Sequence, residues 1–371
     1  MAWLPDELPA QLTPVWSIDV NARGLGGVAA TADAVLFSDR GLNDTIDEWK
    51  CVSAATGRES WAYSYPCRGN LDYGNSPRAT PLIDGDRVFV LGAFGHLACL
   101  KLGTGEPVWE LNLRDEFGPA GDPKWGACSS PLLAGGKLVV NPGARDASVV
   151  ALDPATGTVA WKSPGKPAGY GSLLAGTFGG VPQVVGHDAD TLGGWDAATG
   201  RRLWTLKPAV PNDFNVPTPL DLGGKLLVTT ENNGTRLYRF GPGGAIDPAP
   251  VATNRRLAPD THTPVAVGGR VFGVWRRLSC LAVADGLRPV WEADGPAFAR
   301  YAALVATESR VLAVTLEADL VLFDAAGGEY RERGRVKLWP AEKGLYSHPA
   351  FVGSRAYARG GASLARFDLG G

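Results

Sequence analysis

The chain has 371 residues, of which 45% are apolar and 20% charged, and its formal net charge is −2. This balance gives no electrostatic reason to expect nucleic acid or an anionic membrane surface as a partner. With 49 glycines, 28 prolines and a single methionine, the chain is rich in turns, and we expect an all-β protein with little helix.

The chain opens with a lead-in at residues 1–13, followed by an apolar strand at 14–20 that carries Trp16. The opening lacks the basic start and apolar core of a secretory signal, and no run of 18 apolar residues occurs. We therefore expect no membrane span and a cytoplasmic protein, or a periplasmic or other extracytoplasmic one if a leader was removed. The five cysteines, an odd number, favour free thiols in a reducing compartment.

One phrase recurs along the chain: a short apolar strand, a turn that ends in glycine, and an aromatic residue in the strand that follows. The clearest copy is SVVALDPATGTVAW at 148–161, and the others lie at 51–61, 99–109, 194–204, 280–291 and 321–330. Self-similarity of this kind is the signature of a repeat architecture.

Eight runs rich in valine, leucine and phenylalanine alternate in polarity and predict the second strand of each repeat. They lie at 34–38, 87–91, 137–141, 182–186, 225–229, 270–274, 310–314 and 355–359. A first strand precedes each across a short turn, starting at Gly27, Ala79, Ser129, Gly171, Pro217, His262, Tyr301 and Ser347. Units of roughly 40 to 52 residues match four-stranded propeller blades. We predict a single domain over 1–371, an eight-bladed β-propeller of four-stranded antiparallel blades.

The last repeat supplies only three strands, whereas the strand at 14–20 has no repeat of its own. An open propeller would expose edge strands, which invite association. We therefore predict that strand 14–20 completes the last blade and closes the ring. We also expect the tryptophans of the fourth strands to pack between neighbouring blades, each burying about 150–250 Å². These are Trp16, Trp61, Trp109, Trp161, Trp204 and Trp291.

The phrase of aspartate, two residues, Thr-Gly and a tryptophan four residues later is nearest to consensus at 151–161 and 194–204. It resembles the docking motif of the pyrroloquinoline-quinone-like β-propeller repeat family. The resemblance covers essentially the whole chain and implies the propeller fold. It implies less about activity, because the family includes quinone-dependent alcohol dehydrogenases, non-catalytic binding modules and a propeller lipoprotein that assists outer-membrane protein assembly.

The enzymes of that family hold their quinone over a disulfide between adjacent cysteines and bind Ca²⁺ through Glu, Asn and Asp side chains. This chain has no adjacent cysteines, and its acid and amide pairs at first-strand mouths are Asp72 with Asn75 and Asp213 with Asn215. Because Ca²⁺ takes six or more oxygen ligands, we expect neither pyrroloquinoline quinone nor calcium.

The four histidines, His96, His187, His262 and His348, fall in four different repeats and lack metal-ligand spacing. His262 and His348 occupy equivalent first-strand positions and could both face the central channel. No nucleophile elbow, phosphate-binding loop or kinase signature occurs. We therefore lean towards a protein without enzymatic activity and expect no metal site.

The connections between blades, and the loops between second and third strands, lie on one face of a propeller. Here that face carries the long segments 63–78, 111–128, 205–216 and 39–49, whereas the turns of the opposite face are short. Long loops on a rigid scaffold are where binding tends to be located. The acidic strings at 44–48 and 188–190 are interpreted as solvated turns.

Polar and aromatic residues precede the first strands, where the chain enters the channel, and their composition is typical of a recognition surface. We predict that they bind the ligand: Arg23, Tyr73, Asn75, Trp125, Tyr170, Asn215, His262, Arg300, Tyr346 and His348. The leading hypothesis is a non-enzymatic, monomeric scaffold propeller that recognises a protein, peptide or small ligand. The alternative is a quinone- or metal-dependent oxidoreductase with its site in the channel.

Overall fold

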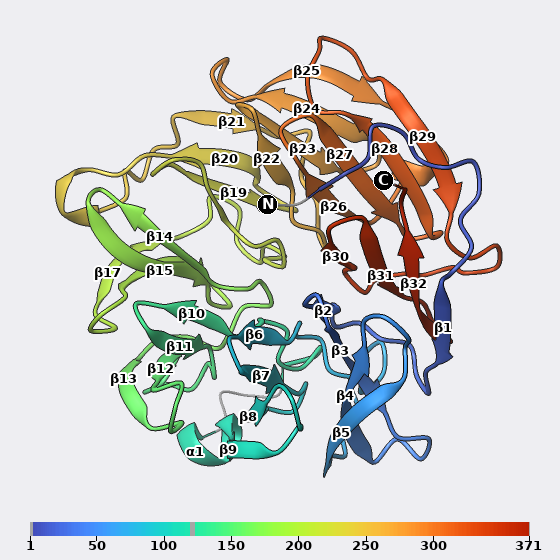
Figure 1. Cartoon of the computed structure of the whole chain (residues 1–371). Coiled ribbons are helices and arrows are strands. Elements are labelled where there is room, and N and C mark those ends of the chain that lie inside the picture. Colours follow the sequence, from blue (N-terminus) through green and yellow to red (C-terminus); the bar gives the residue numbers. More distant parts are fainter. Residues whose placement is uncertain (1–2, 119–122, 371) are drawn as a thin grey trace. The chain divides into compact units, whose positions relative to one another are not determined.

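The computed structural model describes residues 3–118 and 123–370, whose strands form eight four-stranded antiparallel sheets (Figure 1). The predicted fold, an eight-bladed β-propeller, is confirmed. The chain divides into two compact units: the first comprises residues up to Pro66 together with those from Thr261 onward, and the second runs from Cys67 to Asp260. Each unit contains four blades.

The first unit contains blades one, six, seven and eight. Blade one consists of β2 (Ala29–Ala30), β3 (Ala34–Arg40), β4 (Ile46–Ser53) and β5 (Glu59–Pro66). Blade six consists of β22 (Val265–Val267), β23 (Arg270–Val274), β24 (Leu278–Ala282) and β25 (Arg288–Ala293). Blade seven consists of β26 (Ala302–Ala306), β27 (Arg310–Thr315), β28 (Asp319–Asp324) and β29 (Glu332–Lys337). Blade eight joins β30 (Ala350–Val352), β31 (Arg355–Arg359) and β32 (Ser363–Asp368) to β1 (Trp16–Asp19).

The second unit contains blades two to five. Blade two consists of β6 (Leu82–Asp84), β7 (Arg87–Leu91), β8 (His96–Lys101) and β9 (Pro107–Asn112). Blade three consists of β10 (Leu132–Ala134), β11 (Lys137–Val140), β12 (Val149–Leu152) and β13 (Val159–Ser163). Blade four consists of β14 (Leu174–Phe178), β15 (Val181–His187), β16 (Leu192–Asp196) and β17 (Arg202–Leu206). Blade five consists of β18 (Leu220–Asp221), β19 (Leu226–Thr230), β20 (Gly234–Tyr238) and β21 (Ala252–Asn254).

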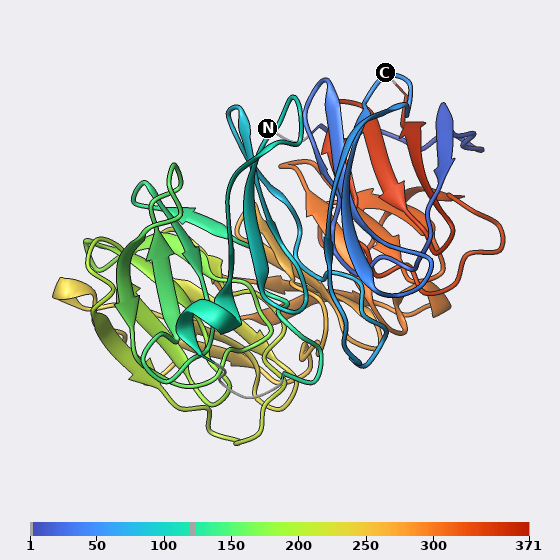
Figure 2. The same ribbon diagram turned by 90° about the horizontal axis from the view of Figure 1, so that it is seen from below.

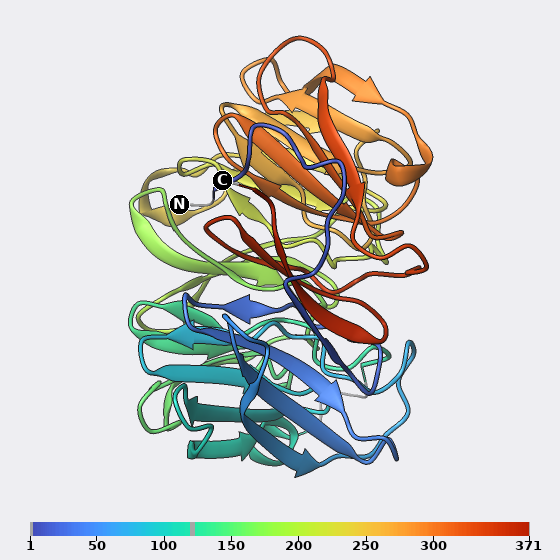
Figure 3. The same cartoon turned by 45° about the vertical axis from the view of Figure 1, so that its right-hand side comes forward.

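The predicted closure by the N-terminal strand is confirmed. β1 pairs antiparallel with β32, with Trp16 opposite Arg366 and Asp19 opposite Ser363. In Figure 3, the dark blue start of the chain lies beside the dark red strands of blade eight. The strand at the N-terminus therefore covers the edge that β32 would otherwise expose.

The docking role predicted for the fourth-strand tryptophans is confirmed within each unit, and in the first unit the indole N–H of Trp16 donates to the Ala54 carbonyl at 3.1 Å. The indole N–H of Trp109 donates to the carbonyl of Pro154 at 3.1 Å, and that of Trp161 donates to Ala197 at 3.2 Å, each in the next blade. The turn glycine is required because Gly157 has a φ of +72° and a Cβ there would lie 2.7 Å from the Trp109 ring. The Thr-Gly turn therefore receives the tryptophan of the preceding blade and joins the two blades.

Blade five lacks this phrase, and the tryptophan before it docks differently. Trp204 donates to the side-chain oxygen of Gln183 at 2.7 Å, inside its own blade. The amide nitrogen of Gln183 then donates to the carbonyl of Gly244 at 2.8 Å. A glutamine thus replaces the Thr-Gly turn as the link between blades four and five.

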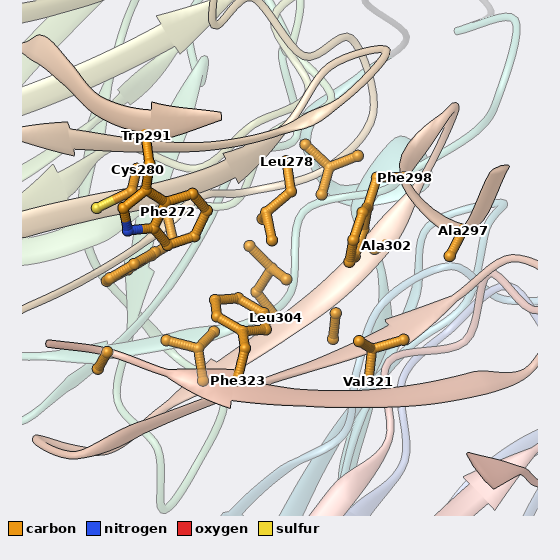
Figure 4. Close-up of a cluster of buried hydrophobic side chains, with 14 residues drawn as sticks. Phe272, Leu278, Cys280, Trp291, Ala297, Phe298, Ala302, Leu304, Val321 and Phe323 are labelled. Carbon is orange, nitrogen blue, oxygen red and sulfur yellow. The ribbon is translucent and has the colours of Figure 1, made fainter. Parts of the chain in front are cut away.

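The core of the first unit includes an aromatic cluster between blades six and seven (Figure 4). The rings of Phe272 and Trp291 each lie 6.0 Å from Phe323, centroid to centroid. Cys280 lies opposite Trp291 in the sheet and is fully buried. Each large apolar side chain buried in this way contributes roughly 1.5–3 kcal/mol to stability.

The segment 39–49 is not the enlarged loop that we predicted. β3 continues to Arg40 and β4 begins at Ile46, so the sheet ladder occupies most of the segment. The guanidinium of Arg40 contacts the Asp47 carboxylate at 2.5 Å, and the hydroxyl of Tyr65 donates to the same carboxylate at 3.1 Å. The interpretation of 44–48 as a solvated turn is therefore wrong, because alternation along β4 turns Asp47 inward.

A second buried carboxylate, Asp39, joins blades one and eight within the first unit. It accepts the backbone N–H groups of residues 21, 22 and 40 and pairs with Lys50 and Arg359, each at 3.2 Å. The side chains of Asp39 and Arg359 are both 0% exposed. Burial lowers the pKa of Arg359 to about 10, opposed by the attraction of Asp39.

Helices are short where the structure describes the chain. α1 (Leu113–Phe117) follows β9 and is the teal coil in Figure 2. Two 3₁₀ turns lie at Pro242–Gly244 and Pro296–Phe298. Across the described residues, no helix combines the length and apolar character needed to cross a membrane. The long connection 111–128 includes residues 119–122, which lie outside the described part.

Candidate functional site

The ten predicted binding residues divide equally between the two units, and all lie on segments that lead into first strands. The second unit holds Tyr73, Asn75, Trp125, Tyr170 and Asn215. The first unit holds Arg23, His262, Arg300, Tyr346 and His348.

Three aromatic side chains from three successive connections pack together in the second unit. The ring of Trp125 stands edge-on to Tyr170 at 4.7 Å and to Phe214 at 5.0 Å, and Tyr170 lies 6.4 Å from Phe214. All three side chains are half-buried. Two of them were predicted, but Phe214 was missed because its polar neighbours Asp213 and Asn215 drew attention. An aromatic residue placed between two polar ones was the available signal.

Tyr73 is 72% exposed and has a φ of +65°, a left-handed conformation that is uncommon for a bulky residue. Its loop is tied to the aromatic group through an ion pair of 3.0 Å between Asp72 and Lys124. The ammonium of Lys124 lies 5.2 Å from the centre of the Trp125 ring.

The Asp72 carboxylate raises the pKa of Lys124, and the hydroxyls of Tyr73 and Tyr170 lie close enough to add to this effect. Lys124 therefore links the exposed Tyr73 with the packed rings. We name Tyr73, Trp125, Tyr170 and Phe214 the aromatic surface.

The two asparagines of the second unit organise the backbone. The amide of Asn75 accepts the Leu71 N–H and donates to the Gly69 carbonyl, both at 3.0 Å. The amide of Asn215 donates to the Asp188 carbonyl at 2.7 Å. Both residues are 7% exposed, so their amides shape the connections that carry the aromatic surface.

A recess lies in the second unit between the end of β15, the segment after β17, and strands β19 and β20. It encloses about 30 Å³, and about 410 Å³ when counted out to its open mouth. This enclosed room accepts a small polar group rather than a cofactor-sized molecule. Its polar lining includes His187, Asp190, Lys207, Asp213, Asn215 and Arg236. We call it the polar recess.

His187 is the innermost titratable group of the polar recess, with 8% of its surface exposed. Burial, and to a smaller extent the nearby charge of Arg236, lower its pKa to about 4, so the imidazole is neutral at pH 7. Its Nε2 has no hydrogen-bond partner among the described residues, and neither does Nε of Arg236. The close approach of two chain segments requires a glycine at position 169, because a Cβ there would lie 2.8 Å from the His187 carbonyl oxygen.

The acidic string at 188–190 is not the solvated turn that we expected. Asp188 is 2% exposed, accepts the Thr191 hydroxyl at 2.8 Å and pairs with Arg202 at 3.0 Å. Its neighbour Asp190 is exposed and pairs with Lys166 at 3.3 Å. The turn is held rigidly because one carboxylate folds inward, and it forms one wall of the polar recess.

In the first unit, the predicted pair His262 and His348 comes together. His262 is buried, its Nε2 accepts the Val274 N–H at 2.9 Å, and its Nδ1 has no partner among the described residues. Burial lowers its pKa to about 3, with a further contribution from the nearby His348. The pKa of His348 is also lowered by the surrounding protein, although its side chain reaches solvent.

The remaining predicted residues of the first unit contact their own scaffold. The Tyr301 hydroxyl donates to the Tyr346 carbonyl at 3.0 Å, and the two rings lie 5.4 Å apart. Arg23 donates to the Lys343 carbonyl at 3.3 Å. Arg300 is exposed and pairs with Glu317 at 3.0 Å.

Solved structures similar to this chain include proteins with different functions. One is BamB from Moraxella catarrhalis, with a TM-score of 0.67 and 16% identity over 96% of this chain and 99% of that one. Another is the quinohemoprotein alcohol dehydrogenase from Comamonas testosteroni, with a TM-score of 0.68 and 14% identity over 98% of this chain and 77% of the enzyme. At these identities the similarity shows the fold alone.

A curated relative is the quinohemoprotein alcohol dehydrogenase ADH IIB from Pseudomonas putida, 26% identical over 164 residues. The match covers 41% of this chain and only 22% of the enzyme. The similarity therefore concerns a segment of blades and leaves most of the enzyme unmatched.

The side chains of this chain do not fit the quinone and Ca²⁺ site implied by the enzymes of the family. Cys51, Cys99 and Cys280 are free thiols in three different blades, and burial raises the pKa of each to about 11. Of the acid and amide pairs, Asp72 binds Lys124, and Asp213 accepts the backbone N–H of Asn232 at 2.7 Å. Within the described residues, no three histidine, cysteine or carboxylate side chains gather as metal ligands would.

The family is shown by a model that matches residues 47–286, well over half of the chain, and is described as outer membrane protein assembly factor BamB. The repeated Thr-Gly and tryptophan phrase lies within this range, and the blades that it fastens have the geometry reported above. The chain belongs to this pyrroloquinoline-quinone-like, BamB-type family of β-propellers.

Proposed function

We propose that the protein is a non-enzymatic binding and scaffold propeller that recognises a protein or peptide through the aromatic surface of its second unit. The observation that carries this proposal is the exposed Tyr73, linked through Lys124 to the half-buried rings of Trp125, Tyr170 and Phe214. Aromatic side chains of this kind are enriched at interfaces, because they offer a large contact area at a small entropic cost. No cofactor takes part in this proposal.

The scaffold supports the same conclusion. The aromatic residues stand on connections whose backbone is fixed by Asn75, Asn215 and the Asp72–Lys124 pair. A binding surface that is already rigid loses less entropy when a partner docks. The description of the family as an assembly factor for outer membrane proteins also favours a protein partner.

The conformation of Tyr73 gives a further reason. A non-glycine residue at a φ of +65° carries strain of order 1 kcal/mol, and such strain clusters at functional sites. An asparagine would adopt this conformation more readily. The stability of the fold therefore does not explain a bulky aromatic side chain at this position.

The proposal is tested with peptides selected on the wild-type protein from a random display library and measured by calorimetry. Tyr73→Asn keeps the backbone conformation and removes the exposed ring, so we expect affinity to fall at least about tenfold. Val108→Ser is the matched control, because Val108 is an exposed apolar residue of the same unit on the outer strand β9. Equal affinity of Tyr73→Asn and Val108→Ser would refute the proposal.

The segment match to a quinohemoprotein alcohol dehydrogenase favours one alternative, a quinone- or metal-dependent oxidoreductase. Pyrroloquinoline quinone and Ca²⁺ are added together, and the melting temperature and dye reduction with alcohols are measured. A clear thermal shift with dye reduction would support the alternative. We expect neither response.

A further inference from the structure

We propose that the polar recess binds the carboxylate group of an acidic ligand, held by Arg236, Lys207 and His187. The site lies within the second unit, and all three side chains line the same recess. It is separate from the rings of the aromatic surface, which do not line the recess.

Two buried nitrogen atoms of residues that line the polar recess have no hydrogen-bond partner among the described residues. Nη2 of Arg236 donates to the Thr230 hydroxyl at 2.6 Å, but its Nε has no partner among the described residues. Nε2 of His187 is equally without a partner in that part of the chain, although the side chain is more than nine-tenths buried. Buried polar atoms are normally satisfied, so two of them lining one recess indicate a missing polar occupant.

The carboxylates around the polar recess already accept hydrogen bonds or form ion pairs, whereas its two cations form no ion pair among the described residues. Asp213 accepts from the backbone N–H of Asn232 and from the Asn233 amide, at 2.7 and 2.5 Å. Asp190 pairs with Lys166 outside the recess. Lys207 is exposed at the recess, and neither it nor Arg236 takes part in an ion pair among the described residues. An incoming anion therefore finds free positive charge.

Charge and size favour a carboxylate over a phosphate. The lining holds two cations, Lys207 and Arg236, and two carboxylates, Asp190 and Asp213, around a neutral His187. A phosphate dianion would face both carboxylates with too little positive charge, whereas a monoanion with two acceptor oxygens suits a guanidinium and an imidazole N–H. The room for the centres of water-sized groups, about 30 Å³, suits a small anion.

The position of the recess relates it to the aromatic surface. Residues 213 and 215 line the recess, and Phe214 between them belongs to the aromatic surface. Consecutive Cα atoms are about 3.8 Å apart, so a ligand on the aromatic surface has the recess within a few residues of its length. The idea that one ligand engages both the recess and the aromatic surface rests on the proposed function. The carboxylate site does not depend on it.

The test follows the arginine Nε–H signals of ¹⁵N-labelled protein by NMR as sodium acetate is added to about 100 mM, with sodium chloride and sodium phosphate as references. Millimolar affinity is expected for so small a probe. The Arg236 signal, assigned by its loss in Arg236→Lys, should shift saturably with acetate and not with chloride. His187→Ala should weaken acetate binding at least about tenfold, because it removes a buried donor.

Arg239→Lys is the matched control, since Arg239 follows β20 closely but pairs with Asp247 away from the recess. It should bind acetate as the wild type does, and so should Tyr73→Asn. Thermal unfolding identifies any variant that fails to fold, and the wild-type titration decides the question without a variant. No saturable shift with acetate, or an equal shift with chloride or phosphate, would overturn the proposal.

Two further probes separate the sources of the carboxylate, and both are measured on the wild type. Capped hexaglutamate that binds at least about tenfold tighter than acetate, with capped hexaglutamine inactive, indicates an acidic peptide. Equal affinities of acetate and hexaglutamate indicate a small organic acid. If acetate binds but no selected peptide depends on Tyr73, the proposed function fails and the carboxylate site stands.

Discussion

The two units use equivalent segments, those that lead into first strands, for different purposes. In the first unit, His262 is buried and bonded to Val274, and Tyr346 accepts from Tyr301. In the second unit, Tyr73 is exposed, and Trp125 and Tyr170 are half-buried and pack edge to face. At these positions the first unit therefore bonds its side chains to the scaffold, whereas the second unit presents the Tyr73 side chain to solvent. Repetition fixes the scaffold, and the segments where repeats differ carry the specificity.

The largest expected effect comes from the first unit. Deletion of residues 1–20 removes β1 and leaves β32 as an exposed edge. We expect a sharp fall in melting temperature or aggregation, measured by calorimetry and light scattering. An unchanged melting curve would contradict the role of β1 in closing the last blade.

A smaller loss is expected from Asp39→Asn. This change leaves Arg359, which is fully buried, and the partly buried Lys50 without their shared carboxylate. Breaking a buried charge pair on one side costs about 3–5 kcal/mol, which urea denaturation would measure. Asp247→Asn in the second unit weakens a pair with the exposed Arg239 and a hydrogen bond from the Ala249 N–H, and it should cost much less. Equal costs would show that the buried pair does not stabilise the first unit.

The pH dependence of the free energy of unfolding tests the role of the buried His262 in the first unit. The pKa of His262 is about 3 in the folded protein and near 6.5 in the unfolded chain, so the unfolded state binds more protons between these values. Its stabilising contribution is therefore complete above pH 6.5 and is lost as the pH falls towards 3. At pH 5 the loss is roughly 2 kcal/mol.

His262→Gln keeps an acceptor for the Val274 N–H and cannot be protonated. We expect its free energy of unfolding to fall less between pH 7 and pH 5 than that of the wild type, by roughly 2 kcal/mol. His187 would still titrate in the variant, so some pH dependence remains. The same slope in both proteins would mean that His262 is not held neutral.

The smallest expected effect on stability is at the aromatic surface. Tyr73→Asn relieves a left-handed tyrosine and should raise the free energy of unfolding by up to about 1 kcal/mol. A gain in stability together with a loss of binding would show that Tyr73 serves binding and not the stability of the fold. A marked destabilisation would instead make Tyr73 part of the scaffold.

The sequence predicted the scaffold well, because blade strands alternate in polarity and the Thr-Gly turn demands a positive φ in every copy. β7, β23 and β31 coincide with their predicted ranges. The prediction from sequence failed at 44–48 and 188–190. A charged residue in a strand is interpreted as a surface residue until its partner across the sheet is known. Asp47 finds Arg40 and Asp188 finds Arg202 only after folding.

The candidate site was predicted less completely. Trp125 and Tyr170 were predicted as separate positions, but their contact with Phe214 depends on how three connections cross, which no local pattern specifies. The polar recess was missed altogether. Its members His187, Lys207 and Arg236 lie far apart in the chain and come together only when blades four and five are folded and packed.

Site-specific photo-crosslinking tests the central difference between the units most directly. A benzophenone amino acid replaces Tyr73 in one protein and Tyr346 in another, and each is irradiated in cells that produce the protein. We predict a discrete crosslinked partner from position 73, lost when Phe214→Ser is added and competed by a selected peptide, and none from position 346. Crosslinks from position 346 alone would contradict the assignment of binding to the aromatic surface.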